Sequence, residues 1–318
     1  LFSEIDGPAA GTGYAQLRVA GTVSLNGPLL RLALGFAPAP GQDFVLIAND
    51  GPGTVGGTFA GAPEDALLAH GGQFFDISYA GGRGRDVDLL SQSRGDLFVR
   101  GLFADFSAPS TRGTRAPFEA QVDGGQARLI VAQNFLTSPA RFLGEVNLFY
   151  AVFGQPHDGL EGVYLRQLLS GVPAGQVLVN FLTSRSFRRR HAGNTAFAKA
   201  LFTALLGHAP GKHDRLGHHT LAFYVQELNS GAVSRAGLVR QLLASDEVYA
   251  AAVTQNFETL LGTVPTPAQR QALNGQLFSG GLTPNALSGL LVTQEAYVDF
   301  FLARAAAGRV PGVVLTNV

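Results

Sequence analysis

The stretch FFDISYAGGRGRDVDLLSQSRGDLF, residues 74–98, contains the point at which the periodicity of the chain changes. Up to Leu90, β-branched and apolar residues lie between glycine-rich turns, a pattern that indicates strands. From Leu97 onward, apolar residues recur every three or four positions, which indicates helices. The stretch therefore predicts a multidomain α+β protein, with an all-β domain before it and an all-α domain after it.

We expect three parts: a Gly-rich β domain over residues 1–92, a helical-repeat domain over 93–310 and a β-prone tail over 311–318. The β domain is either a β-sandwich or the end of a β-solenoid. Its expected strands are bounded by Gly, Pro, Asn or Asp. They are Tyr14–Leu25, Leu29–Phe36, Phe44–Asp50, Phe74–Ala80 and the closing segment RDVDLL.

Two glycine motifs in the β domain resemble ligand sites. Gly51-x-Gly53-x-x-Gly56 matches a dinucleotide fingerprint, but that fingerprint needs a helix directly after it and GTFAGAPED cannot start one, so we expect no dinucleotide site. GGRGRD resembles the start of a calcium-binding nonapeptide. It occurs once, and Asp88 stands where an apolar residue is needed. Asp86 and Asp88 share one strand face, so they are weak calcium candidates. The alternative is a charged, solvent-facing strand edge.

The segment GQDFVLIANDGPGTVGGTFAGAPED, with GGQFFDISYAGGRGRDVDLL after it, resembles the closing segment of autotransporter-associated β-strand repeat passengers. The resemblance spans about residues 20–90. It implies a β-solenoid end or a small β-sandwich on a secreted bacterial protein.

The second region repeats a three-helix pattern. NLFYAVFG, ALFTALLG and QNFETLLG each end in a glycine that we expect just after the helix, at Gly154, Gly207 and Gly262. A second helix then ends at a polar residue plus glycine, and a third precedes a Ser or Thr that can cap the next helix. Repeated units of this kind bury their apolar faces by stacking, so we expect about four three-helix units.

The helical region resembles the domain-of-unknown-function family 4214 over about residues 95–302. LLGHAP, LLGTVP and LLASDEVY are the best matches, whereas the middle-helix Trp of the family is absent. The resemblance implies a bacterial cell-surface or secreted protein, a family often found beside calcium-binding repeats or carbohydrate-related modules. The family has no agreed enzymatic activity, so the resemblance indicates location more than chemistry.

Composition limits the chemistry and indicates the compartment. The 318 residues contain no Cys, which excludes disulfides and thiolate chemistry. They also contain no Met, so we expect the chain to be part of a longer or processed precursor. No apolar run is long enough to span a bilayer. Residues 1–92 carry nine acidic and four basic side chains, and the rest carry fourteen and nineteen, so charges of −5 and +5 sit at opposite ends of the chain. Such charges favour head-to-tail contact, although chance explains them as well.

Two clusters carry possible binding chemistry. His208, His213, His218 and His219 fall in one loop, but their spacing fits no regular metal site, so we expect a solvated loop; a metal site or a pH-sensitive contact is the alternative. Arg188, Arg189 and Arg190 end a helix, where they favour the helix dipole or face an interface. No aromatic platform accompanies them, and the whole chain is neutral, so we expect no nucleic-acid partner.

The tail, GRVPGVVLTNV, is β-prone. Val313, Val314 and Leu315 either pack on their own chain or add a strand to a neighbouring molecule. No catalytic motif is present, so we expect no enzyme and no cofactor. Our hypothesis is an exported bacterial structural or assembly protein of a cell-surface layer, extracellular filament or matrix. Its partners are copies of itself or other surface components, and polymers form head-to-tail. The alternative is a glycan- or calcium-binding module of a surface adhesin.

Overall fold

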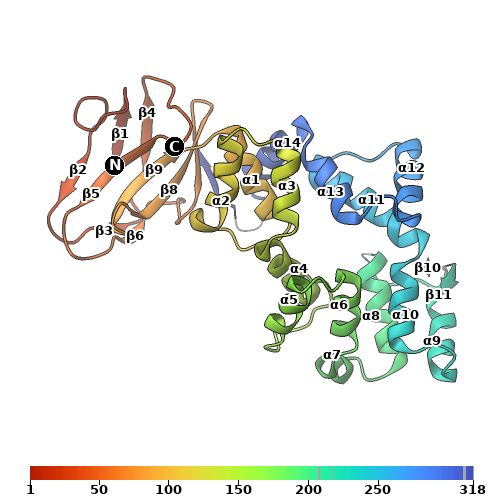
Figure 1. Ribbon diagram of the computed structural model, residues 1–318. Coiled ribbons are helices and arrows are strands. Elements are labelled where there is room, and N and C mark those ends of the chain that lie inside the picture. Colours follow the sequence, from red (N-terminus) through yellow and green to blue (C-terminus); the bar gives the residue numbers. More distant parts are fainter. Residues whose placement is uncertain (207, 217, 311–312, 318) are drawn as a thin grey trace. The chain divides into compact units, whose positions relative to one another are not determined.

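The computed structural model describes residues 1–206, 208–216, 218–310 and 313–317 (Figure 1). Strands occupy residues 2–91 and helices follow over 94–306, so the expected α+β layout is confirmed. The chain forms two compact units. We call residues 1–104, 110–127 and 298–318 the β unit, and residues 105–109 and 128–297 the helical unit.

The first six strands wind into two turns of a β-solenoid. They are β1 (Phe2–Ile5), β2 (Leu17–Val19), β3 (Ser24–Asn26), β4 (Arg31–Leu34), β5 (Asp43–Asn49) and β6 (Gly56–Thr58). β1 pairs with β4, β2 with β5 and β3 with β6, always in parallel. Residue 2 lies beside 31, 17 beside 47 and 24 beside 56, so one turn takes 29 to 32 residues. We call β1–β3 the first rung and β4–β6 the second.

The segment Tyr14–Leu25, expected as one strand, is instead two strands joined by a corner at Gly21. The corner of the second rung lies directly against it, because a Cβ atom on Gly51 would lie 2.2 Å from the carbonyl oxygen of Gly21. The glycines Gly51, Gly53 and Gly56 thus form a solenoid corner that leads into β6. Gly56 begins a strand, and the expected absence of a nucleotide-binding helix at this point is confirmed.

The second rung is closed by an antiparallel meander and the chain terminus. The meander consists of β7 (Leu67–His70), β8 (Gln73–Gly81) and β9 (Asp86–Ser91), and β12 (Leu315–Asn317) pairs in parallel with β7. The strand order in this sheet is β12-β7-β8-β9-β5-β2. A core of aromatic and aliphatic side chains fills the interior of the β unit. It includes Ile5, Leu32, Phe44, Phe59, Phe75, Ile77, Val87 and Leu89.

Helices cover the other face of the sheet. They are α1 (Arg94–Asp105) and α2 (Arg112–Asp123), whose arginines pair with Asp76 and Asp88 of the sheet. The later part of α14 (Glu295–Ala306) belongs to the same unit. The expected boundaries at residues 92 and 310 mark changes of secondary structure, whereas the compact units divide elsewhere. The physical reason is that α1 and α2 are held to the sheet by buried ion pairs, and the tail contributes β12 to the same sheet.

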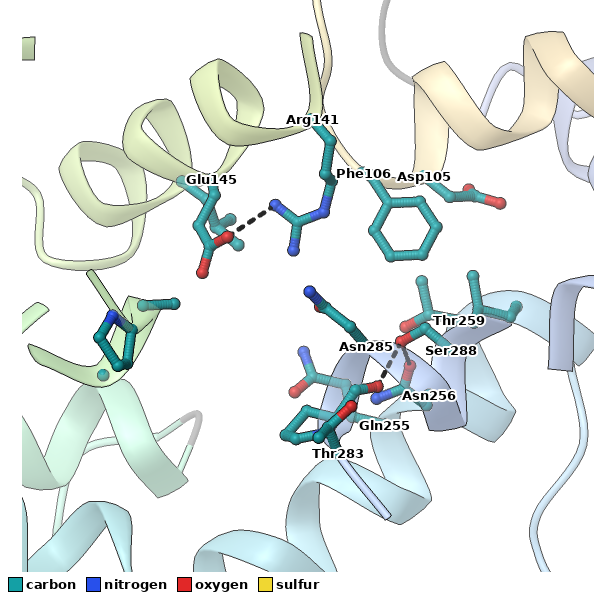
Figure 2. A pocket seen from close by; sticks show the side chains of 16 residues that line it. Asp105, Phe106, Arg141, Glu145, Gln255, Asn256, Thr259, Thr283, Asn285 and Ser288 are labelled. Atoms are coloured by element: carbon teal, nitrogen blue, oxygen red, sulfur yellow. Dashed lines mark hydrogen bonds and ion pairs between the residues drawn. The ribbon is translucent and has the colours of Figure 1, made fainter. Parts of the chain in front are cut away.

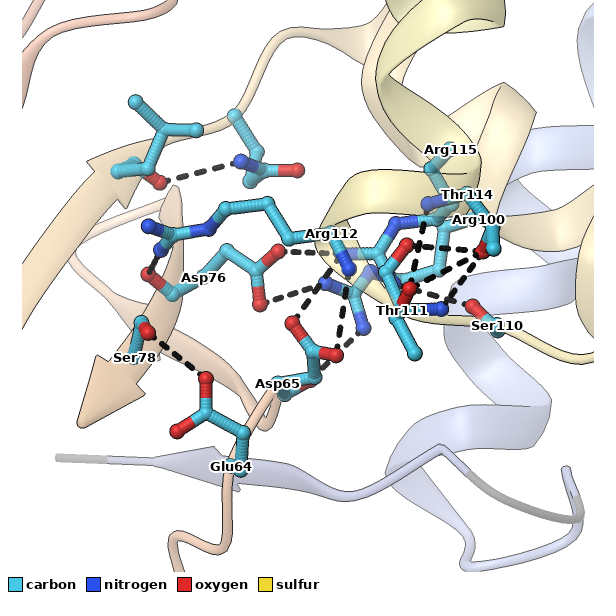
Figure 3. Close-up of polar contacts among 12 residues, drawn as sticks. Glu64, Asp65, Asp76, Ser78, Arg100, Ser110, Thr111, Arg112, Thr114 and Arg115 are labelled. Carbon is cyan, nitrogen blue, oxygen red and sulfur yellow. Dashed lines mark hydrogen bonds and ion pairs between the residues drawn. The ribbon is translucent and has the colours of Figure 1, made fainter. Parts of the chain in front are cut away.

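The ion pairs centre on Asp76 of β8, whose side chain is 1% exposed (Figure 3). Arg100 of α1 lies 2.7 Å from one carboxylate oxygen, and Arg115 of α2 pairs with the other. Arg112 donates a hydrogen bond to the backbone oxygen of Asp76, at 3.0 Å. Because buried arginines require ionic partners, this one carboxylate fixes the positions of two helices against the sheet.

The helical unit has a repeat-like arrangement of helices. Its helices are α3 (Arg128–Leu136), α4 (Pro139–Val152), α5 (Glu161–Leu169), α6 (Ala174–Leu182), α7 (Arg185–Arg190), α8 (Asn194–Leu206), α9 (Leu221–Ser230), α10 (Arg235–Leu243), α11 (Asp246–Leu261), α12 (Pro267–Phe278) and α13 (Pro284–Val292). A short hairpin of β10 (Arg215–Leu216) and β11 (His219–Thr220) precedes α9. Contacts of α3 with α13, of α6 with α10 and of α8 with α11 join distant repeats.

The expected helix ends are largely present. Gly154 and Gly262 follow α4 and α11 with φ of 55° and 66°, a conformation that glycine adopts without strain. Gly207 lies outside the described residues. Ser138 and Ser184 cap the next helices through their hydroxyls, whereas the Ser245 hydroxyl donates to Leu242 instead.

We predict that Asp76→Ala lowers the free energy of unfolding by about 3–5 kcal/mol, because it removes the only ion-pair partner that the buried Arg100 has within the described residues and one of the carboxylates that pair with the buried Arg115. The matched control is Asp50→Ala, which removes the exposed ion pair with Arg18 and should change stability by about 0–1 kcal/mol. Urea unfolding followed by far-UV circular dichroism measures both. Equal losses in the two variants would contradict the role assigned to Asp76.

Candidate functional site

The main candidate site is a cleft of about 690 Å³ inside the helical unit (Figure 2). Its walls are α4, the start of α6, α11, the start of α13 and the segment that contains Asp105 and Phe106. The pairings of α3 with α13 and of α6 with α10 bring the walls together. Polar side chains from opposite walls point toward one another across the space.

One wall carries an ion pair on α4. Arg141 and Glu145 lie one helical turn apart, with 3.2 Å between Nη1 and Oε2, and their side chains are 11% and 14% exposed. The Arg141 guanidinium lies over the Phe106 ring, 5.2 Å from its centre. Burial lowers the pKa of Arg141, and the Glu145 carboxylate opposes that shift. The Nε–H of Arg141 is buried and has no hydrogen-bond partner among the described residues.

Gly144 explains why Phe106 reaches this wall. A Cβ atom on Gly144 would lie 2.4 Å from the backbone oxygen of Phe106 and 2.8 Å from that of Ser107. The absent side chain therefore lets the 105–109 segment lie directly on α4, which places the Phe106 ring under the guanidinium. Ser138 starts α4 by accepting a hydrogen bond from the backbone N–H of Arg141, so the cap sets where Arg141 stands.

The opposite wall presents amides and hydroxyls. The Ser288 hydroxyl donates to Asn256 Oδ1 at 2.7 Å, and Asn256 Nδ2 donates to the Ala252 carbonyl at 2.9 Å. These bonds fix both side chains between α11 and α13. Gln255, Thr259, Thr283 and Asn285 line the same wall and are exposed. The arrangement offers hydrogen-bond donors and acceptors in fixed positions, which suits the binding of a polar molecule.

A second hollow of about 500 Å³ adjoins the cleft. Both are lined by Glu145, Ala174, Gly175 and Pro284. Its remaining lining is mostly apolar and includes Phe149, Val248 and Tyr249. A ligand longer than the polar cleft therefore meets an apolar and aromatic surface next to it.

The two carboxylates considered for calcium have other partners. Asp86 Oδ1 accepts a hydrogen bond from the Asn49 backbone N–H at 2.8 Å. Asp88 pairs with Arg112 at 3.2 Å, and its side chain is 4% exposed. The alternative of a solvent-facing edge is wrong for Asp88, because α2 covers that face of the sheet. Within the described residues, no group of three or more His, Asp or Glu is arranged to hold a metal ion.

The arginine run Arg188, Arg189 and Arg190 forms the exposed last turn of α7, as its sequence predicted, while Phe187 beside it is buried. The backbone oxygens that follow α7 are also held by a cation. Arg235 donates hydrogen bonds to the carbonyl oxygens of His191 and Ala192. Positive charge is therefore gathered at this helix end, where it complements the helix dipole.

The tail packs on its own chain. Val313 packs against the cluster of Phe301, Ala305 and Val310, and the Val314 carbonyl accepts a hydrogen bond from Leu67 at 2.8 Å. Leu315 then pairs with Leu67 in register. Of the two alternatives for Val313, Val314 and Leu315, the structure has the pairing within one chain. Pro311, Gly312 and Val318 lie outside the described residues.

The four histidines of the loop do not converge. Three of them have different neighbours: His208 Nδ1 lies 3.7 Å from Asp214, His218 lies 3.5 Å from Glu247, and the His219 ring stacks on Phe223. The site that does converge, the cleft, was not predicted from the sequence. Its available signals were the Arg141–Glu145 spacing of one turn and the polar residues Gln255, Asn256 and Thr259, which fall close together on α11.

Comparisons with protein-family models, with curated proteins and with solved structures found no match to this chain. Within the described residues, no helix is long and apolar enough to cross a membrane.

We predict a pH effect from Asp88. Burial raises the pKa of this carboxyl to about 6, against the opposing effect of Arg112. A raised pKa means that the folded state holds the proton more tightly. The contribution of Asp88 to stability is thus fully present below about pH 4 and is lost as the pH rises through about 6.

The test compares wild type with Asp88→Asn by urea unfolding between pH 4 and pH 7. Relative to the variant, wild type should gain roughly 1–3 kcal/mol as the pH falls through this range. Asp50→Asn, at an exposed position, serves as the control. A difference between wild type and Asp88→Asn that does not change with pH would contradict the prediction.

Proposed function

We propose that this chain is a non-enzymatic structural protein of the bacterial cell exterior, part of a surface layer, filament or matrix, that assembles head-to-tail through its β unit. The observation that supports this most is the open outer side of the first rung. Within the described residues, β1, β2 and β3 pair with the second rung, and no strand pairs with their other side. An isolated antiparallel bridge between Ile5 and Tyr14 covers the end of β1, so the open part of this side is along β2 and β3.

The exposed rung has the properties of a docking edge. Asp50 donates its backbone N–H to the Val19 carbonyl, so Val19 faces the second rung. Because successive residues of a strand face opposite sides, the N–H and C=O groups of Arg18 face outward. Large apolar side chains on and beside this rung are exposed: Leu1 at 43%, Phe2 at 63%, Leu17 at 51% and Leu29 at 62%. A further layer of strands buries these side chains and pairs these groups.

The occupant that we propose is a second copy, which presents the β12 edge of its own sheet. β2 and β12 are the two ends of the six-stranded sheet, so a β12-to-β2 contact continues the sheet from one molecule to the next. Such a contact joins different surfaces on each partner and extends without closing unless its rotation closes a ring.

The resemblances support location outside the cell. The β unit resembles the closing segment of autotransporter-associated passengers, and the helical repeats resemble a family of bacterial surface and secreted proteins. A chain without cysteine relies on packing and buried ion pairs, such as those of Asp76, in place of disulfides. A module that binds glycan or calcium on a surface adhesin is the alternative function, and the polar cleft favours its glycan form.

The assembly proposal predicts that Arg18→Pro abolishes polymer formation. Proline removes the outward N–H of β2 without deleting a backbone bond to β5. Arg18→Ala is the matched control, because it removes the same exposed ion pair with Asp50 but keeps the N–H, and it should assemble like wild type. Sedimentation velocity and negative-stain electron microscopy over a range of concentrations measure assembly.

Deletion of residues 313–318 removes the opposite edge strand and is expected to reduce assembly as well. The assembly proposal fails if wild type stays monomeric at high concentration, or if Arg18→Pro forms the same polymers. Far-UV circular dichroism of each variant establishes that its fold is retained before assembly is compared.

A further inference from the structure

We propose that the cleft of the helical unit binds a neutral saccharide, with one sugar ring in the polar part and a second over the adjoining apolar hollow. The proposal concerns a site and ligand separate from the assembly edge of the β unit. It stands on the convergence of a buried ion pair, a fixed amide–hydroxyl pair and exposed amides around one cavity. The cavity volume of about 690 Å³ lies within the range of about 300–1,000 Å³ typical of small-molecule sites.

The hydrogen-bonding groups match hydroxyl chemistry. A sugar hydroxyl donates one hydrogen bond and accepts others, so its site needs donors and acceptors side by side. Arg141 supplies donors at the end of its guanidinium, which points into the cleft. Glu145 supplies acceptors, and the amides of Gln255 and Asn285 supply both.

The charges favour a neutral ligand. Glu145 already lies 3.2 Å from the guanidinium of Arg141, and the Asp105 carboxylate lines the same cleft. An anionic ligand therefore meets two carboxylates and one guanidinium that is already paired. A cationic ligand meets Arg141, which burial makes costly to leave unpaired. Neutral polar groups avoid both penalties.

Part of the site is formed before any ligand arrives. Asn256 and Ser288 are locked to each other and to helix backbone, and the Arg141 guanidinium is held between Glu145 and the Phe106 ring. Groups held in this way lose little conformational freedom on binding. The neighbouring hollow adds the Tyr249 side chain, and an aromatic surface of this kind packs against the apolar C–H face of a sugar ring.

The experiment is saturation-transfer NMR followed by calorimetric titration with glucose, N-acetylglucosamine, maltose and cellobiose, using the full chain. We expect a disaccharide to bind more tightly than glucose, and glucose to bind more tightly than glucuronate. The double variant Gln255→Ala/Asn285→Ala should weaken binding by about tenfold or more. Both side chains are exposed, so the fold should be retained.

The matched control is Gln271→Ala/Gln276→Ala, which removes two exposed amides from α12, outside the cleft lining, and should bind like wild type. The proposal is overturned if none of the neutral sugars binds, if glucuronate binds more tightly than glucose, or if the double variant in the cleft binds as well as the control. A peptide library that binds in the cleft while the sugars do not would assign the site to a peptide instead.

Discussion

The buried carboxylate of Asp76 is the constraint on which the arrangement of the β unit depends. It stands on β8 within the sheet and pairs with Arg100 of α1 and Arg115 of α2. Two guanidinium groups that are nearly inaccessible to water require a carboxylate at this position. The helices therefore cannot shift along the sheet without separating these charges. This network makes α1 and α2 part of the β unit, although the helical periodicity joins them to the repeats that follow.

In the helical unit, neighbouring protein groups also hold polar side chains in place, here around the cleft. Gly144 admits the backbone of the 105–109 segment, which brings Phe106 beneath Arg141. Across the space, Ser288 holds Asn256. The helical unit thus carries a polar cleft whose lining is held by its neighbours, and the β unit carries an open strand edge at β2.

The sequence predicted much of the fold and little of the site. Periodicity identified the change from strands to helices near residue 92, and glycines such as Gly154 and Gly262 marked helix ends correctly. The strand expected over Tyr14–Leu25 was divided by Gly21, since a solenoid corner depends on the rung packed against it. Asp88 was expected at a charged edge and is buried, because the helix that covers it comes later in the chain.

The sequence by itself determined the secondary-structure classes, the helix caps and the exclusion of thiol chemistry, because these follow from local propensities and composition. Only the tertiary structure decided which residues meet. Segments far apart in the chain meet in three places. The rungs pair over 29 to 32 residues, and β12 returns to pair with β7. Arg141 meets Asn256 and Ser288 in one cleft. Such contacts depend on packing between elements, which no local pattern encodes.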